Sequence, residues 1–199
     1  MGNYADDPNS ASPGGYFPPS PGSTIHFMTA DQSQATIQPG SCTVRTHRPG
    51  DLGWIVHRHG KLYAEEHGYN ERFEGVVAEV AAAFLRAHHP QFERCWIAEI
   101  DGEMVGSVML VKVSPDVGKL RLMLVEPRAR GCGVGAALVR ECVRFAREAG
   151  YRKITLWTHS NLEAARRLYE RAGFRLMRSE PATEGFGRNL VDETWELQL

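Results

Sequence analysis

Hydrophobic and polar positions follow two different periods along the chain from residue 42 onward. One run is apolar at helical spacing and follows Asn70, a residue type that caps helix N-termini; its members are Phe73, Val76, Val77, Val80 and Phe84. Residues 153–158 (KITLWT) alternate instead and are rich in β-branched and aromatic types, which predicts a strand. The two periods together indicate a domain that mixes helices and strands.

The same patterns predict the order of the remaining elements. Strands are expected at 42–47, 94–99, 103–113, 119–126, 153–158, 174–180 and 193–199, with Asp101-Gly102 as a tight hairpin turn. A first helix is expected at 51–67, with Gly60 as a candidate break, and a second helix begins after Asn70. A third helix is expected after the glycines near 133. A fourth helix is expected between Asn161, which would cap its start, and Gly173, which would end it in left-handed backbone. The predicted order is therefore β-α-α-β-β-β-α-β-α-β-β.

The stretch 120–139 (LRLMLVEPRARGCGVGAALV) carries the clearest chemical signal. An apolar strand leads through Arg128, Arg130 and the glycines 131, 133 and 135 into a helical pattern. Backbone N–H groups converge at such a helix start, which binds phosphate, and glycine lets the backbone approach a pyrophosphate closely. The spacing fits neither the Rossmann fingerprint nor the Walker loop, and simple turn chemistry is the alternative interpretation.

Two motifs resemble the GNAT superfamily of N-acetyltransferases, whose cosubstrate is acetyl-CoA. Arg128-x-x-Gly131-x-Gly133 resembles its pyrophosphate element, and Asn161-x-x-x-Ala165-x-x-Leu168-Tyr169-x-x-x-Gly173-Phe174 resembles its second cofactor motif. The resemblance implies the α/β (α+β) GNAT fold, with a mostly antiparallel mixed sheet, helices on both faces and a splay between the fourth and fifth strands. Residues 43–199 look most like the acetyltransferase half of bacterial MarR–GNAT fusion proteins.

The composition of the chain is that of an ordinary globular enzyme. The chain has 199 residues, a formal net charge of −1 and 42% hydrophobic residues, which suits one domain with a full core and gives no sign of a nucleic-acid partner. Its four cysteines are widely spaced and no apolar run is long enough to cross a membrane, so we expect a cytoplasmic protein without a structural metal site.

Residues 1–41 differ from the rest of the chain. They are dense in Pro, Gly, Ser and Asn and show no hydrophobic period, so they cannot bury enough apolar surface to offset the entropy of ordering. We expect a flexible tail at 1–41 and a GNAT acetyltransferase domain at 42–199. The tail is too short and too polar for a winged helix, so DNA binding is not carried over from the fusion proteins.

The resemblance also implies roles for individual residues. The N–H of Met123 would polarise the thioester carbonyl and stabilise its oxyanion, the N–H of Val125 would bind the pantetheine arm, and Tyr169 would protonate the leaving thiolate. Side-chain packing is the alternative role of Tyr169. The other expected cofactor contacts are Arg128, Arg130, Gly131, Cys132, Gly133, Val134, Gly135, Ala136 and Asn161.

The general base and the acceptor stay open at this point. Lys119 occupies the place where some family members have a glutamate base, which leaves His57, His59, Glu65, Glu66 and Asp116 as candidates. The acceptor is expected to be a small-molecule or peptide amine that contacts His59, Glu66 and Tyr69, and acidic side chains in this segment favour a cationic amine.

Two classes of function remain in view. The first is an acyltransferase that moves an acetyl group from acetyl-CoA to a primary amine by direct attack in a ternary complex, with a longer acyl group in place of acetyl as an open alternative. The second is an acetyl-CoA-binding sensor or interaction module without turnover, which would not need Tyr169 as a proton donor. The fold often pairs through edge strands, so a homodimer is a candidate assembly.

Overall fold

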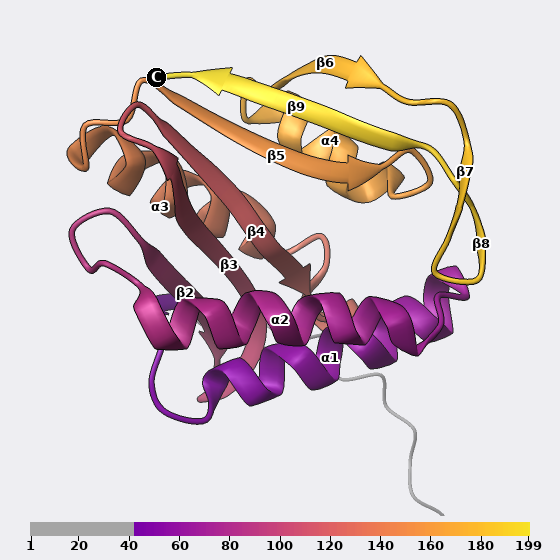
Figure 1. Ribbon diagram of the computed structural model, residues 1–199. Helices are drawn as coiled ribbons and strands as arrows, with labels where there is room; N and C mark the ends of the chain where they lie inside the picture. Colours follow the sequence, from indigo (N-terminus) through magenta and orange to yellow (C-terminus); the bar gives the residue numbers. More distant parts are fainter. Residues whose placement is uncertain (1–41) are drawn as a thin grey trace, which may run out of the picture. The chain divides into compact units, whose positions relative to one another are not determined.

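The computed structural model describes residues 42–199, and the predicted tail at 1–41 lies outside the described residues. A seven-stranded sheet has the order β1-β2-β3-β4-β5-β9-β6, and only β4 and β5 run parallel (Figure 1). Its strands are β1 (Thr43–Thr46), β2 (Arg94–Ile100), β3 (Glu103–Ser114), β4 (Val117–Val125), β5 (Lys153–His159), β6 (Arg175–Ser179) and β9 (Asp192–Gln198). This mixed, mostly antiparallel sheet confirms the predicted fold class.

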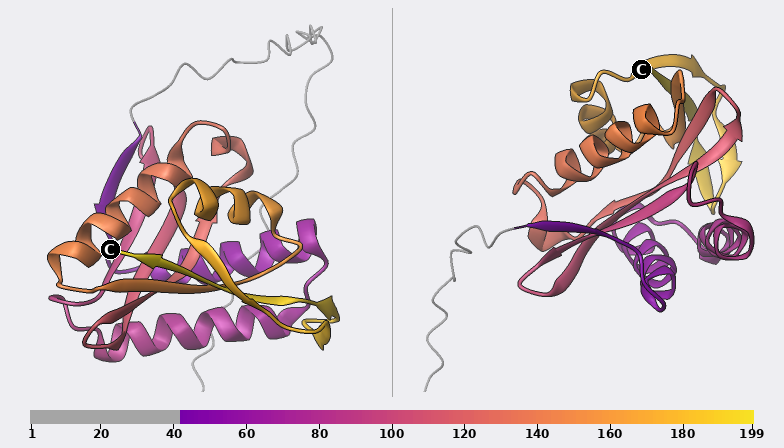
Figure 2. Two further views of the ribbon diagram at one scale, coloured as in Figure 1. Left: turned by 90° about the horizontal axis from the view of Figure 1, so that it is seen from above. Right: turned by 90° about the vertical axis from the view of Figure 1, so that its left-hand side faces the viewer.

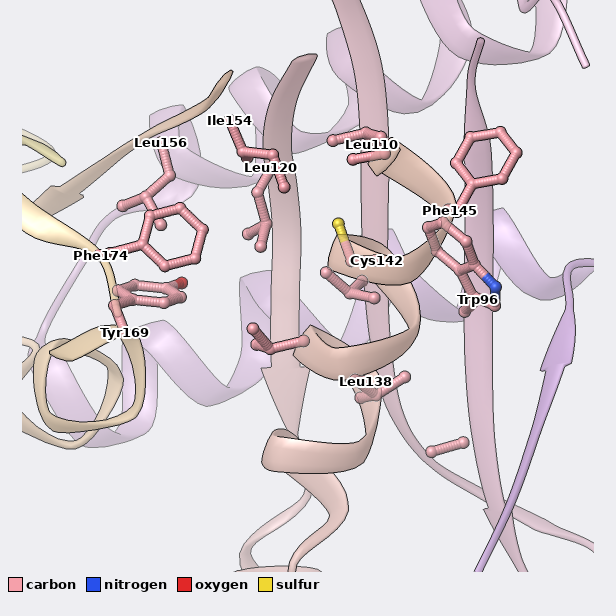
Figure 3. Packing of buried hydrophobic residues seen from close by; sticks show 14 of the residues in the cluster. Trp96, Leu110, Leu120, Leu138, Cys142, Phe145, Ile154, Leu156, Tyr169 and Phe174 are labelled. Atoms are coloured by element: carbon pink, nitrogen blue, oxygen red, sulfur yellow. The ribbon is translucent and has the colours of Figure 1, made fainter. Parts of the chain in front are cut away.

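Helices cover both faces of the sheet, as predicted. Helices α1 (Asp51–His67) and α2 (Glu71–Ala87) pack on one face, while α3 (Val134–Glu148) and α4 (Glu163–Arg171) lie on the other (Figure 2). Figure 3 shows the α3 face, where Leu138, Cys142 and Phe145 pack against side chains of the strands. Strands β2 and β3 therefore bury alternate residues in two separate cores.

The helix of residues 51–67 is continuous, so the candidate break at Gly60 is wrong. A Cβ at Gly60 would lie 2.7 Å from the carboxylate of Glu74 on α2. The glycine thus lets α1 and α2 approach each other closely, and the packing between them holds the helix together. The predicted cap at Asn70 is confirmed, since its side chain accepts a hydrogen bond from the N–H of Arg72.

The predicted helix start at Asn161 is also wrong. Helix α4 begins at Glu163, after a turn in which the N–H of Leu162 donates to the carbonyl of His159, and the N-cap residue is Leu162. The predicted stop at Gly173 is confirmed, with φ of 93° and the N–H of Phe174 returning to the carbonyl of Tyr169. The side chain of Asn161 is thereby free for other contacts.

The connection between β6 and β9 contains a small hairpin that the sequence patterns did not predict. Strands β7 (Thr183–Gly185) and β8 (Arg188–Leu190) pair antiparallel. At its tip Phe186 packs on the rings of Tyr69 and Phe73, and its carbonyl accepts from the N–H of Asn70. The hairpin thus docks on the turn between α1 and α2.

Candidate active site

A bulge in β4 opens the sheet. Strand β4 pairs with β5 only from Val117 to Leu120, and its register against β3 then shifts between Ser107 and Met109. At the shift Leu122 adopts left-handed backbone with φ of 48°, and the Ser107 hydroxyl donates to its carbonyl at 2.9 Å. Beyond the bulge β4 and β5 no longer pair, which is the splay that the resemblance implies.

Two main-chain amides of β4 face this opening. The N–H of Glu126 donates to the carbonyl of Val105 on β3 at 2.8 Å. Because backbone groups alternate in direction along a strand, the N–H groups of Val125 and Met123 point away from β3, towards the splay. Both residues line a cavity of about 660 Å³ between α3, α4 and the last turns of α1, here named the donor cavity.

The loop after β4 supplies a second group of amides. A 3-10 turn, η1 (Pro127–Ala129), leads to Gly131 and Gly133, which have φ of 79° and 81°, and Gly133 is the N-cap of α3. Within residues 42–199, none of the N–H groups of 131–136 donates to a backbone carbonyl. A Cβ at either of these two glycines would meet no atom within 4 Å, so the loop has room beside it for a diphosphate.

The predicted cofactor contacts divide into two groups in the structure. Two lie outside the lining of the donor cavity: the Arg128 side chain is exposed and reaches Glu103 at 4.0 Å, and Cys132 is exposed with its thiol facing the Arg130 carbonyl at 3.7 Å. The residues that line the cavity are Met123, Val125, Arg130, Gly131, Gly133, Val134, Gly135, Ala136 and Asn161.

Arg130 joins the loop to α1 across the donor cavity. Its guanidinium donates to Glu66 Oε1 at 2.9 Å and to the Val125 carbonyl at 3.2 Å. Glu66, predicted to contact the acceptor, therefore lines the donor cavity and lies outside the second cavity of the site. A second ion pair, from Arg58 to Glu126 at 2.6 Å, fixes α1 to the end of β4.

A smaller cavity of about 80 Å³ is lined by α1, α2, α4 and the two splayed strands, and it is here named the acceptor cavity. His59, a predicted acceptor contact, lines this cavity and is 2% exposed. The His59 Nδ1 atom lies 2.9 Å from the Ile55 carbonyl, so Nδ1 carries the proton and Nε2 keeps its lone pair. Burial lowers the pKa of His59 to about 4, and the imidazole is therefore neutral at pH 7.

The two cavities meet at the splay, because Tyr63, Met123, Leu162 and Ala165 line both. Tyr169 lines the acceptor cavity beside them and is 5% exposed. Burial, with a smaller contribution from Tyr63, raises the pKa of the Tyr169 phenol, so it remains protonated at neutral pH. Sequence reasoning missed Tyr63, because its helical spacing resembles that of any core aromatic.

Tyr69, the third predicted acceptor contact, is part of a buried network and lines neither cavity. Its hydroxyl lies 2.9 Å from His159 Nδ1 and 3.3 Å from Asn161 Oδ1, and His159 Nε2 lies 3.3 Å from Asp192 Oδ1. Burial lowers the pKa of His159, and this neutral ring lines the acceptor cavity. Residues from α1–α2, β5 and β9 meet here, which no local motif could indicate.

Among the described residues, no group of three His, Cys, Asp or Glu side chains is placed to hold a metal ion. In the same part of the chain, no helix is long and apolar enough to cross a membrane.

The mixed seven-stranded sheet, in which β4 and β5 run parallel and then splay apart, defines the class of proteins with the GNAT fold. The model of the Acetyltransferase (GNAT) family matches residues 57–174, and the chain belongs to this family. Acetyl-CoA is the cosubstrate of the family, and the free amides and open space beside residues 131–136 fit its diphosphate.

Individual relatives agree with this assignment. The chain is 31% identical to "Probable N-acetyltransferase camello" of Xenopus tropicalis over 122 residues, 60% of this chain and 54% of that protein. It is 35% identical to the mycothiol acetyltransferase of Nocardia farcinica over 105 residues, 53% of this chain and 33% of that protein. The chain thus spans a third to about half of the length of these curated relatives.

A solved structure supports the fold. The structure of yncA from Salmonella typhimurium, determined with its cofactor acetyl-CoA, superposes with a TM-score of 0.64 at 20% identity, over 80% of this chain and 94% of that one.

Proposed function

We propose that this protein transfers the acetyl group of acetyl-CoA to the primary amine of a small molecule or peptide, by direct attack in a ternary complex. The observation that carries the proposal is that two cavities, one beside α3 and the other beside α2, meet at the splay. A donor in one cavity and an acceptor in the other come into contact only there. This arrangement serves direct transfer without a covalent enzyme intermediate.

Main-chain amides hold the donor in this proposal. The N–H groups of residues 131–136 bind the diphosphate at the start of α3, where the helix dipole favours negative charge. When the diphosphate binds, the Arg130 guanidinium leaves its ion pair with Glu66 and pairs with a phosphate instead. The N–H of Val125 binds the pantetheine arm, and Asn161 contacts it from the other side of the splay. Arg128 and Cys132 lie at the rim, where Arg128 adds positive charge.

The chemical step uses Met123 and Tyr169. The amine nitrogen attacks the thioester carbon, and the N–H of Met123 donates to the oxygen that becomes negative. The new C–N bond forms as the C–S bond breaks, and the Tyr169 hydroxyl gives its proton to the sulfur. The proton that the attacking nitrogen loses passes through water to the Tyr169 oxygen and restores the hydroxyl. His59 Nε2, the lone-pair nitrogen of a neutral ring that lines the acceptor cavity, orients the amine by accepting one of its N–H groups.

Thiol release from acetyl-CoA with a panel of amines, together with mass analysis of the products, tests the transfer. Tyr169→Phe should lower kcat about 100-fold while acetyl-CoA affinity measured by calorimetry stays close to that of the wild type. Tyr151→Phe is the matched control, because this buried tyrosine donates to the Phe92 carbonyl and lines neither cavity. Acetyl-CoA binding without thiol release for any amine would favour the non-catalytic sensor instead.

We propose that residues 43–199 are related to the acetyltransferase half of bacterial MarR–GNAT fusion proteins, which they resemble in sequence. Four free thiols, at Cys42, Cys95, Cys132 and Cys142, suit the reducing cytoplasm, which is the proposed location of the protein.

Strands β1 and β6 are the sheet edges and offer surfaces for a homodimer, which light scattering of the purified protein would detect.

A further inference from the structure

The acceptor cavity has an unusual balance of charge and hydrophobicity. One side is apolar, with Val76, Val77 and Val80 of α2 facing Leu122 and Trp157 of the strands. No Asp or Glu of the described residues lines it, and Arg121 is the charged side chain that does. A cationic amine such as a polyamine would find no carboxylate there, so the expectation drawn from the acidic residues of α1 does not suit this cavity.

Arg121 and Lys119 are half-buried cations two residues apart on β4, before the bulge, and therefore on the same face of the sheet. Across residues 42–199, neither side chain forms an ion pair or a hydrogen bond with another residue. Burial lowers the pKa of both groups, and the neighbouring charge of Arg121 lowers that of Lys119 further. The two charges thus repel each other without any compensating anion.

Other half-buried cations of this chain are compensated. Arg94 lies 4.1 Å from the centre of the Phe145 ring, and four more form ion pairs with carboxylates: Arg45, Arg58, Lys153 and Arg166. Burying a cation without a partner destabilises the folded state, and such groups are retained where a ligand supplies the missing charge. Arg121 and Lys119 therefore indicate an anionic group on the molecule that enters the acceptor cavity.

We propose that the acceptor is an apolar amino acid, whose carboxylate binds Arg121, with Lys119 adding positive charge, while its side chain occupies the apolar wall of the acceptor cavity. This inference rests on the proposed function and specifies the acceptor of the same site. The planar guanidinium matches a carboxylate through two parallel hydrogen bonds. Arg121 and Met123 are two residues apart, so their Cα atoms are separated by at most about 7 Å. The carboxylate at Arg121 and the amine that attacks beside the Met123 amide can therefore belong to one amino acid, in which they are only a few bonds apart.

Matched pairs of acceptors test this proposal. In thiol-release assays, leucine and phenylalanine are compared with 3-methylbutylamine and 2-phenylethylamine, which lack the carboxylate, and with spermidine. We expect kcat/KM for each amino acid to exceed that of its decarboxylated partner by about 10-fold or more. Arg121→Gln should reduce this ratio to about 1, chiefly through a higher KM for the amino acid.

Two further measurements separate binding from a structural role. Arg121→Gln should raise the melting temperature, because it removes an uncompensated half-buried charge, whereas a structural arginine would lower it when replaced. Arg147→Gln, a change of an exposed arginine in the last turn of α3, is the control and should alter neither the acceptor ratio nor its KM. Calorimetry of leucine with the CoA-loaded protein measures acceptor binding even without turnover.

The outcomes distinguish this inference from the proposed function. Transfer to 3-methylbutylamine or spermidine as efficient as transfer to leucine would overturn the inference and leave acetyl transfer intact. Binding of leucine that Arg121→Gln abolishes, without turnover of any amine, would support the inference and contradict the proposed reaction. A wild-type protein that neither binds nor acetylates an amino acid would overturn the inference.

Discussion

At the scale of single residues, the site depends on Leu122. A leucine in left-handed backbone is unfavourable by about 1–2 kcal/mol, so neighbouring groups must hold it there. One such group is the fully buried Ser107 hydroxyl, which donates to the Leu122 carbonyl. The bulge that frees the Met123 amide is therefore maintained by a side chain on the neighbouring strand.

Replacing Ser107 with alanine should loosen this bulge. The Leu122 carbonyl would lose its donor, which costs about 1–3 kcal/mol of unfolding free energy when the carbonyl is buried. Urea denaturation measures the loss, and kcat with the best acceptor should fall because Met123 is held less well. Ser114→Ala, at the outer end of the same strand, is the control. Unchanged stability and kcat in Ser107→Ala would contradict this role.

His59 predicts how stability depends on pH. Its pKa is about 4 in the folded protein and about 6.5 in the unfolded chain, so between these values the unfolded chain binds more protons. The contribution of neutral His59 to the free energy of unfolding is therefore complete above pH 6.5. It is lost as the pH falls, and the free energy of unfolding is about 2 kcal/mol lower at pH 5 for this reason. His59→Phe keeps an aromatic ring against Tyr63 but has no group that titrates. Between pH 7.5 and pH 5 its free energy of unfolding should fall by about 2 kcal/mol less than that of the wild type. Parallel losses in the two proteins, measured by urea denaturation, would show that His59 titrates normally.

At the scale of elements, Gly106 sets the spacing between β3, β4 and α3. A Cβ at this position would lie 2.9 Å from the Leu124 carbonyl and 3.0 Å from the Leu138 side chain. Gly106→Ala should therefore push β4 and α3 away from β3. We expect it to lower the free energy of unfolding by about 1–3 kcal/mol and to weaken acetyl-CoA binding. Gly75→Ala is the control, since a Cβ on this exposed helical glycine would meet nothing within 4 Å. Equal effects of the two changes on stability and affinity would contradict a spacing role for Gly106.

Sequence patterns predicted the elements with strong periodicity and failed where tertiary packing decides. The alternation at 153–158 and the cap at Asn70 correspond to β5 and the start of α2, because both signals are local. Gly60 does not break α1, since its lack of a side chain accommodates Glu74 of another helix. Asn161 does not cap α4, because the turn after β5 begins the helix two residues later.

The candidate site was predictable to a similar extent. The glycine motif located the donor cavity, since its backbone geometry is encoded within a few consecutive residues. The acceptor cavity was not predictable, because Tyr63, Arg121 and His159 come from three elements that only the fold brings together. Arg121 lies in an apolar strand whose pattern does not show that the cation lacks a partner.

At the scale of the whole molecule, donor binding should stabilise the fold. The donor cavity is built from β4, α3, α4 and α1, so the unfolded chain cannot bind acetyl-CoA there. At a ligand concentration of 100 times Kd the gain is about 2.7 kcal/mol, which raises the melting temperature by about 5–10 °C in a domain of this size. Gly133→Val should remove the shift, because φ of 81° disfavours a branched side chain and the amides would turn away. A shift of full size in Gly133→Val, seen by differential scanning fluorimetry, would place binding elsewhere.

The central claim is that main-chain amides between Met123 and Ala136 bind the thioester and the diphosphate of acetyl-CoA. The most direct test is a titration of the ¹⁵N-labelled protein with acetyl-CoA, followed by two-dimensional NMR of the backbone amides. We expect the amide resonances of Met123, Val125 and residues 131–136 to shift together with a single Kd, while those of β1 and β6 at the sheet edges do not shift. Saturable shifts that leave Met123, Val125 and 131–136 unchanged, or no shift at any concentration, would contradict it.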